Sequence, residues 1–241
     1  MAKINFILQG KGGVGKSLVS FFLAQYFKNQ GQETLCFDTD PVNHTFASFP
    51  ALNVQSFDLL ENGRIIERAF DQFVMALIEA PKDAAIVIDN GASTFLPLCA
   101  YLKENDTISL LQEQGHEVLL HSVITGGPSI LDTMNGLQAL LVNFPDVPIA
   151  VWLNEYFGRT EIDGVAVEDS KLVKKFSDRV HAFIHIGQRN NDLFSHDFDN
   201  MLKKRLTFEE ARHDSSIWIL NRQRLVMIQR ETFEQIYQAN L

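Results

Sequence analysis

The sequence predicts an α/β fold, with a mostly parallel sheet of about seven strands and helices on both of its faces. Short apolar segments of strand length alternate with helix-length segments along all 241 residues. Several of these apolar segments end in an acid or an amide, at the edge where parallel sheets bind ligands. A glycine-rich loop follows the first strand. No repeat or long linker interrupts the alternation, so we expect one domain over residues 1–241.

Composition narrows the class of protein. The formal net charge is −9 with a pI of about 5.2, which argues against broad nucleic-acid binding but does not forbid a local basic patch. Lys203 to Arg205 form one basic triple, most simply a solvated helix end and second a DNA or partner patch. We expect Cys36 and Cys99 to be buried thiols in a reducing compartment. No signal peptide or run of 18 apolar residues occurs, so we expect a cytoplasmic protein without direct membrane insertion.

The glycine-rich loop, GKGGVGKS at residues 10–17, matches the phosphate-loop pattern G-x-x-x-x-G-K-[ST]. A strand is expected before it at residues 4–9, and a helix after it, beginning at Ser17, with an apolar run over 18–27 and a stop at Gly31. Strand, glycine loop and helix are the context that the motif needs. The sequence therefore predicts nucleotide binding by a P-loop domain.

The residue types of the loop suit a phosphate chain. Glycines let backbone N–H groups approach the oxygens closely, and the first turn of the helix adds unpaired donors. Lys16 is placed to reach the β and γ oxygens, and the Ser17 hydroxyl can ligate Mg²⁺. We expect nucleotide contacts from Gly10, Lys11, Gly12, Gly13, Val14, Gly15, Lys16, Ser17 and Leu18.

Two further strands end in acids. Residues 33–37 lead to Asp38-Thr39-Asp40-Pro41, whose carboxylates would serve the ligand or, alternatively, only cap the next turn. Residues 84–89 form a continuously apolar strand that ends at Asp89, a Walker B pattern in which the acid holds the Mg²⁺ shell.

The remaining elements follow from hydrophobic periodicity. Residues 42–63 are expected to be irregular, with His44 as a loop residue. We expect no metal site at His116 and His121, which have no third ligand nearby. The expected strands cover residues 118–124, 148–153 ending in Asn154, and 180–186, and the expected helices cover 64–80, 94–103, 129–143 and 216–238. Core positions are assigned to Ile65, Ala69, Phe73, Ala76 and Leu77 of the second helix and to Trp218, Leu225, Ile228, Phe233, Ile236 and Tyr237 of the last.

The second lysine of the loop, Lys11, gives the stretch KGGVGKS, which resembles the deviant Walker A motif of the ParA/MinD family of ATPases. The resemblance implies that Lys11 crosses to a partner subunit's nucleotide, so that the ATP state is a homodimer. D-x-D-P resembles switch I, which implies that Asp40 positions the attacking water and senses the γ-phosphate. Asp40, Lys11 and Lys16 are then the catalytic residues, and Ser17, Asp40 and Asp89 are the candidates for the Mg²⁺ site.

The same resemblance implies that Asn154 pairs with the adenine ring, which favours ATP over GTP. A turn residue is the alternative for Asn154. Two departures from the family pattern stand out. Asn90-Gly91 follows the Walker B acid where a proline is usual, and Gly187-Gln188-Arg189 replaces a proline near the base, leaving the second adenine contact unassigned. Cys36 does not match the cluster cysteines of the nitrogenase iron protein, so no iron–sulfur role is expected.

A narrower resemblance covers nearly the whole chain. LQGKGGVGKS, LCFDTDPVNHTF, VIDNGAS, VWLNEYFG and DFDNMLKKRLTFEEA are similar to the TraL group, ParA-like ATPases encoded in the transfer regions of conjugative plasmids. It implies a slow, partner-stimulated ATPase in conjugation or mobilisation, with a partner from a transfer or secretion apparatus. The alternatives are a ParA-type partitioning protein that coats nonspecific DNA and, less favoured, a small-molecule kinase.

Overall fold

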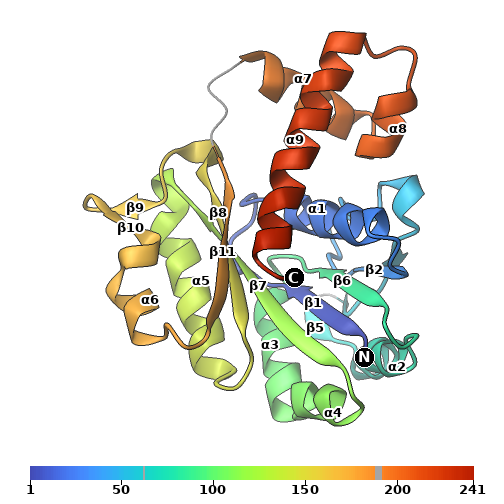
Figure 1. Ribbon diagram of the computed structural model, residues 1–241. Helices are drawn as coiled ribbons and strands as arrows, with labels where there is room; N and C mark the ends of the chain where they lie inside the picture. Colours follow the sequence, from blue (N-terminus) through green and yellow to red (C-terminus); the bar gives the residue numbers. More distant parts are fainter. Residues whose placement is uncertain (62, 188–191) are drawn as a thin grey trace.

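The computed structural model describes residues 1–61, 63–187 and 192–241, and it confirms the predicted α/β fold. Seven strands form one sheet in which every pairing is parallel, in the order β11-β8-β7-β1-β6-β2-β3 (Figure 1). Their bounds are β1 Lys3–Ile7, β2 Thr34–Asp38, β3 Gln55–Ser56, β6 Ala85–Asp89, β7 Glu117–Thr125, β8 Ile149–Asn154 and β11 Val180–Ile186. The glycine loop thus lies at the carboxyl end of a central strand.

Helices cover both faces of this sheet because successive strand side chains point to opposite sides. From β1, Ile4 and Phe6 join the core beneath one helical layer, whereas Ile7 joins the core beneath the other. The first layer contains α2 (Glu67–Ile78), α3 (Phe95–Glu104), α4 (Thr107–Glu113), α5 (Ile130–Asn143) and α6 (Lys171–Lys175). The second contains α1 (Lys16–Asn29), α7 (Asp192–Lys203), α8 (Phe208–His213) and α9 (Ile219–Gln238).

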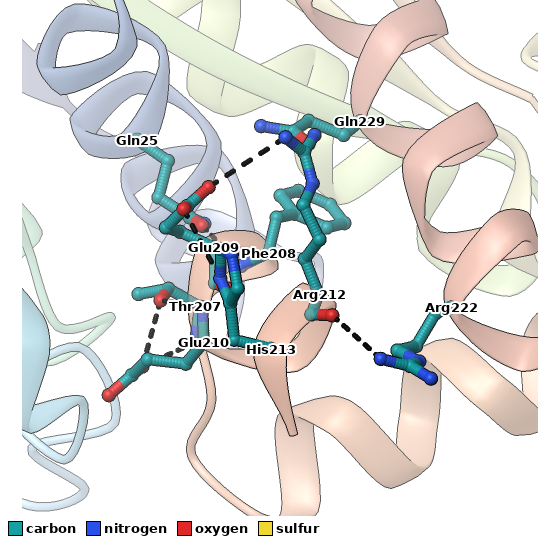
Figure 2. A network of polar contacts seen from close by, with 9 residues as sticks. All are labelled: Gln25, Thr207, Phe208, Glu209, Glu210, Arg212, His213, Arg222 and Gln229. Carbon is teal, nitrogen blue, oxygen red and sulfur yellow. Dashed lines mark hydrogen bonds and ion pairs between the residues drawn. The ribbon is translucent and has the colours of Figure 1, made fainter. Parts of the chain in front are cut away.

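The last helices pack against the helix that follows the glycine loop. Figure 1 shows α9 beside α1, and Figure 2 shows how α8 is joined to them. Thr207 caps α8 in a reciprocal capping box with Glu210. The backbone N–H of Phe208, which follows this cap, donates to Oε1 of Gln25 in α1 at 2.7 Å (Figure 2). The chain's C-terminal part is therefore anchored to α1.

Three sequence expectations are wrong. Residues 42–63 are not wholly irregular, because they contain a short 3-10 helix (Pro50–Leu52), the edge strand β3 and strand β4 (Leu60–Glu61). Ile65 is not on a helix. It lies in β5 (Arg64–Ile65), which pairs with β4, and it is 41% exposed. An Asn-Gly pair at residues 62–63 is the hairpin signal that periodicity alone overlooked.

The third correction concerns the last helix. Leu225, Ile228, Phe233 and Ile236 are buried as predicted, but Trp218 is 79% exposed and Tyr237 is 67% exposed. Trp218 precedes the first turn of α9, and only one side of the helix faces α1 and α8. The basic triple does end a helix, since α7 stops at Lys203.

Several smaller elements were not predicted from the sequence. Besides α4, α6 and α8 they are the hairpin β9 (Glu161–Ile162) and β10 (Val165–Ala166) and the 3-10 turns at Gly127–Ser129, Glu155–Phe157 and Val167–Asp169. Both cysteines are buried free thiols, as expected. Within the described residues, no helix has the length and apolar character needed to cross a membrane.

Gly136 in α5 offers a test of how tightly this helix packs on the glycine loop. A Cβ at this position would lie 1.9 Å from Oε1 of Gln9, whose buried amide donates to the carbonyls of Val123 and Thr133 at 3.0 Å each. We expect Gly136→Ala to destabilise the protein by about 1–3 kcal/mol despite the better helix propensity of alanine. Urea unfolding would measure this free energy.

The control variant is Gly187→Ala, because an added Cβ there meets no atom of the described residues within 4 Å. The double variant Gly136→Ala/Gln9→Ala should lose less than the sum of the two single losses, since it removes the clash. Strict additivity would contradict this explanation.

Candidate functional site

The glycine loop has the backbone conformation that its sequence requires. It connects β1 to α1, and Gly13 and Gly15 have φ values of 74° and 103°, which favour glycine. A Cβ at Gly15 would also lie 2.8 Å from Nδ2 of Asn154. The loop can therefore bring backbone N–H groups close to a ligand at the carboxyl edge of the sheet.

Lys16 is the first residue of α1, and its side chain folds back onto the loop. It is 7% exposed, and its ammonium donates to the backbone carbonyl of Lys11 at 3.0 Å. Burial lowers the pKa of Lys16, while the nearby carboxylates of Asp89 and Asp40 oppose that shift. The ammonium thus already lies between the loop and the two acids that the sequence assigns to the site.

Asp89 ends β6 at the bottom of the site and is 1% exposed. It accepts a hydrogen bond from the Ser20 hydroxyl at 3.0 Å, and the nearby Ser17 hydroxyl acts to lower its pKa. Burial raises the pKa of Asp89 to about 7, with the adjacent Asp38 acting in the same direction and the serines and Lys16 opposing it. Sequence reasoning missed Ser20, although it lies one helical turn after Ser17.

The side-chain oxygens of Ser17 and Asp89 fit a Mg²⁺ ion that is bound partly by the protein and partly by a nucleotide. Ser17 and Asp89 offer a hydroxyl and a carboxylate, the hard ligands that Mg²⁺ prefers, and Mg²⁺ commonly keeps waters and phosphate oxygens as well. Among the residues that the structure describes, no group of three or more His, Cys, Asp or Glu side chains could hold a metal by itself. An ion here would need waters or phosphate oxygens to complete its shell.

The segment that resembles switch I, residues 38–43, is organised by its own two aspartates. The buried Asp38 accepts the backbone N–H groups of Asp40 and Ala47, each at 2.9 Å, and burial nevertheless raises its pKa. Asp40 accepts N–H groups from Val42 at 2.9 Å and Asn43 at 3.3 Å. In this structure both acids therefore do what the capping alternative describes, and the role of Asp40 toward water stays a prediction.

Lys11 lies at the rim of the site, near the start of α5. Its ammonium pairs with Asp132 at 2.8 Å, and the two side chains are 42% and 55% exposed. Such an exposed ion pair contributes little stability and exchanges readily. Lys11 is accordingly available to another partner.

Asn154 lies at the carboxyl end of β8 and is 4% exposed. Its Nδ2 donates to the carbonyl of Val14 at 2.9 Å, and its Oδ1 accepts from the N–H of Tyr156 at 3.1 Å. The side chain therefore braces the glycine loop, which the sequence did not predict. The amide keeps one further N–H and one further lone pair with which to meet a base.

A cavity of about 540 Å³ adjoins Asn154 and the first turns of α1. Leu18 and Phe22 of α1 form part of its wall, and α7 and α9 contribute Phe198 and Ile228. Its mixed apolar and polar lining suits a planar heterocycle. Gly187 lines the cavity, but Gln188 and Arg189, considered for the second adenine contact, lie outside the described residues.

A glycine loop on β1 with the acids of β2 and β6 beside it places the chain among the P-loop NTPases. Within this class, the chain can be assigned to a narrower family. Residues 6–236 match CbiA, the CobQ/CobB/MinD/ParA nucleotide binding domain, so the chain belongs to this family.

Two curated relatives are similar in sequence over almost the whole chain, and one solved structure is similar in fold. The chain is 45% identical over 237 residues to a "Protein TraL" of Escherichia coli, covering 98% of both chains. It is 43% identical over 240 residues to another "Protein TraL" of the same organism, covering 99% of both. Its fold is similar to that of the MinC:MinD cell division protein complex of Aquifex aeolicus, with a TM-score of 0.53, 13% identity, and coverage of 95% of this chain and 94% of that one.

The raised pKa of Asp89 generates a prediction about stability. Because its pKa is about 7 in the folded protein and 3.8 as an ordinary side chain, folding takes up a proton between these values. The stabilising contribution is complete below pH 4 and is lost as the pH rises through 7. Relative to wild type, Asp89→Asn should therefore gain unfolding free energy from pH 5 to pH 8, by at most about 1.4 kcal/mol per pH unit.

Urea titrations at pH 5, 6, 7 and 8 would measure this difference. The control is Asp214→Asn, because hydrogen bonds from Ser216 lower the pKa of Asp214, which leaves its contribution constant over this range. A difference between Asp89→Asn and wild type that does not change with pH would contradict the assignment.

Proposed function

We propose that this chain is a Mg²⁺-dependent ATPase, formed as one domain over residues 1–241, that switches between a monomer and an ATP-bound homodimer. The observation that carries the proposal is the convergence of Lys16, Ser17 and Asp89 beneath the glycine loop. The loop would hold the phosphates, Lys16 would neutralise the β and γ oxygens, and Ser17 and Asp89 would hold the ion or its waters. Mg²⁺ would supply charge neutralisation on the phosphates.

Asp40 is the residue that we propose orients the attacking water. Its carboxylate lies close enough to Lys16 to influence the pKa of that lysine, and it is only partly buried. Its Oδ1 accepts the N–H groups of Val42 and Asn43 and its Oδ2 accepts the side-chain amide of Asn43, so a rearrangement of switch I would free more of the carboxylate to serve water. Such a rearrangement of switch I agrees with slow turnover that a partner accelerates.

We propose that adenine binds in the cavity beside Asn154, which would give a preference for ATP. The cavity supplies apolar walls for a ring, and the remaining N–H and lone pair of the amide match one edge of adenine. The Asn154 contact supports ATP over GTP without requiring the residues outside the described ranges.

The homodimer is supported by the surface that surrounds the loop. Exposed apolar side chains follow the carboxyl ends of four different strands, and those ends all meet at one edge of the sheet. They are Val42, Leu96, Leu131, Tyr156 and Phe157. A second copy facing this edge would cover them and would bring its Lys11 toward the nucleotide.

Conjugation or mobilisation of plasmids is the proposed setting. The 45% identity to proteins named TraL, over almost the whole chain, supports it. We propose a cytoplasmic protein whose partner belongs to a transfer or secretion apparatus. DNA coating is less well supported, because the chain carries a net charge of −9 and Lys204 of the basic triple already pairs with Asp214.

Lys16→Ala tests the assignment of the site. We expect the variant to lose ATP turnover and most of its ATP affinity, because it removes the ammonium beneath the phosphates. Phosphate release and equilibrium binding would measure the two effects. Lys174→Ala, which removes an exposed lysine paired with Asp169, is the matched control and should behave as wild type. Normal binding and turnover by Lys16→Ala would show that the site is assigned wrongly.

Asp40 variants test the dimer. Asp40→Ala and Asp40→Asn should both trap ATP, and the asparagine keeps an oxygen that can accept the loop N–H groups. Light scattering should give a dimer with Mg²⁺ and ATP but a monomer with Mg²⁺ and ADP. Adding Lys11→Ala to either variant should return the ATP state to a monomer. A dimer that persists with Lys11→Ala would exclude the cross-subunit role of that lysine.

A further inference from the structure

Thr39, between the two aspartates of switch I, is fully buried and points toward switch II, the loop at residues 89–94. Its backbone N–H donates to the carbonyl of Asp89 at 2.9 Å. Its hydroxyl lies 3.0 Å from that same carbonyl and 3.1 Å from Oδ1 of Asn90. One hydroxyl proton is shared between two acceptors, so this side chain joins both residues to switch I.

Asn90 is held in a fixed orientation by its second contact. Its Nδ2 donates to the carbonyl of Gly91 at 3.0 Å, which leaves Oδ1 facing Thr39. The side chain is 1% exposed, so breaking either hydrogen bond would leave a buried polar group unpaired. This asparagine occupies the position where the sequence departs from the broader family pattern.

Thr94 completes the connection from the far side of switch II. Its hydroxyl donates to the backbone carbonyl of Thr39 at 3.1 Å, and the residue is fully buried just before α3. The peptide units around Thr39 are therefore bonded both to the start of switch II and to its end.

Gly91 lies between these bonds and touches Asp40. A Cβ on Gly91 would lie 2.8 Å from Cγ and Oδ1 of Asp40 and 3.0 Å from its Cα. The two switch loops are thus in contact at the aspartate proposed to orient water.

We propose that Thr39, Asn90 and Thr94 form a buried tether that makes the two switch loops move together and so positions Asp40 for hydrolysis. The inference rests on the proposed ATPase function. Among the described residues, the carboxylate of Asp40 accepts hydrogen bonds from Val42 and Asn43 of its own loop. The hydrogen bonds that join this loop to switch II are made by its neighbour Thr39. None of the three tether residues belongs to the glycine loop. They are positioning residues that act on turnover and not on nucleotide affinity.

The experiment compares Thr39→Val, which keeps the shape of the side chain and removes the hydroxyl, with Thr39→Ser, which keeps the hydroxyl. We expect Thr39→Val to lower kcat about tenfold or more while KM for ATP and Kd for ADP stay within about twofold of wild type. Thr39→Ser should stay close to wild type in all three. Ile149→Val, a core change at the opposite end of the sheet, controls for a loss of stability alone.

Two results would overturn the tether. One is a kcat for Thr39→Val within about twofold of wild type, and the other is an equal loss of kcat in Thr39→Ser. If the wild-type protein showed no ATP turnover, that result would count against the proposed function. The tether would then be tested by a second measurement that needs no turnover. In amide hydrogen exchange without nucleotide, Thr39→Val should speed exchange at residues 91–94 as well as at 40–47. Faster exchange at 40–47 alone would show that the loops are independent.

Discussion

The three neighbouring strands β1, β6 and β2 end at the same level of the sheet. The rest of the site depends on this constraint. In the parallel register Asp89 of β6 lies opposite both Asp38 of β2 and Ile7 of β1. Two carboxylates and the start of the glycine loop are therefore held in one layer with little access to water. The raised pKa of Asp89 and the burial of Lys16 both follow from this crowding, and the hydroxyls of Ser17 and Ser20 offset part of its cost.

The helices on the two faces of the sheet contact the glycine loop in different ways. The helix α1 starts at the loop itself, and its other end is held by α8 and α9, so its position is set by both ends of the chain. In the opposite layer, α5 contacts the start of the loop in two places. The carbonyl of Thr133 accepts a hydrogen bond from the side chain of Gln9, and Asp132 forms an exposed ion pair with Lys11. The first contact is buried and fixed, whereas the second is exposed and exchangeable. This difference suits a loop whose backbone stays in place while one lysine changes partner.

Most of the sheet and the glycine loop could be predicted because they depend on local patterns. Apolar runs ending in Asp38, Asp89 and Asn154 mark strands, and the loop motif has fixed spacing. The edge strand β3 and the exposed side chain of Trp218 could not be found in this way. Pairing of β3 with β2 is decided by tertiary contact, and periodicity cannot tell which side of α9 is covered. The bracing of the loop by Asn154 was hidden for the same reason, since it joins residues 140 positions apart.

During synthesis of the chain, the two walls of the cavity beside Asn154 are made at different times. One wall comes from Leu18 and Phe22 near the start of the chain, and the facing wall comes from Phe198 and Ile228 near its end. At about 5–20 residues per second, the ribosome releases these two walls many seconds apart. A nascent chain therefore exposes its glycine loop long before it can enclose a base. Firm nucleotide binding is therefore expected only after the whole chain has been made and folded.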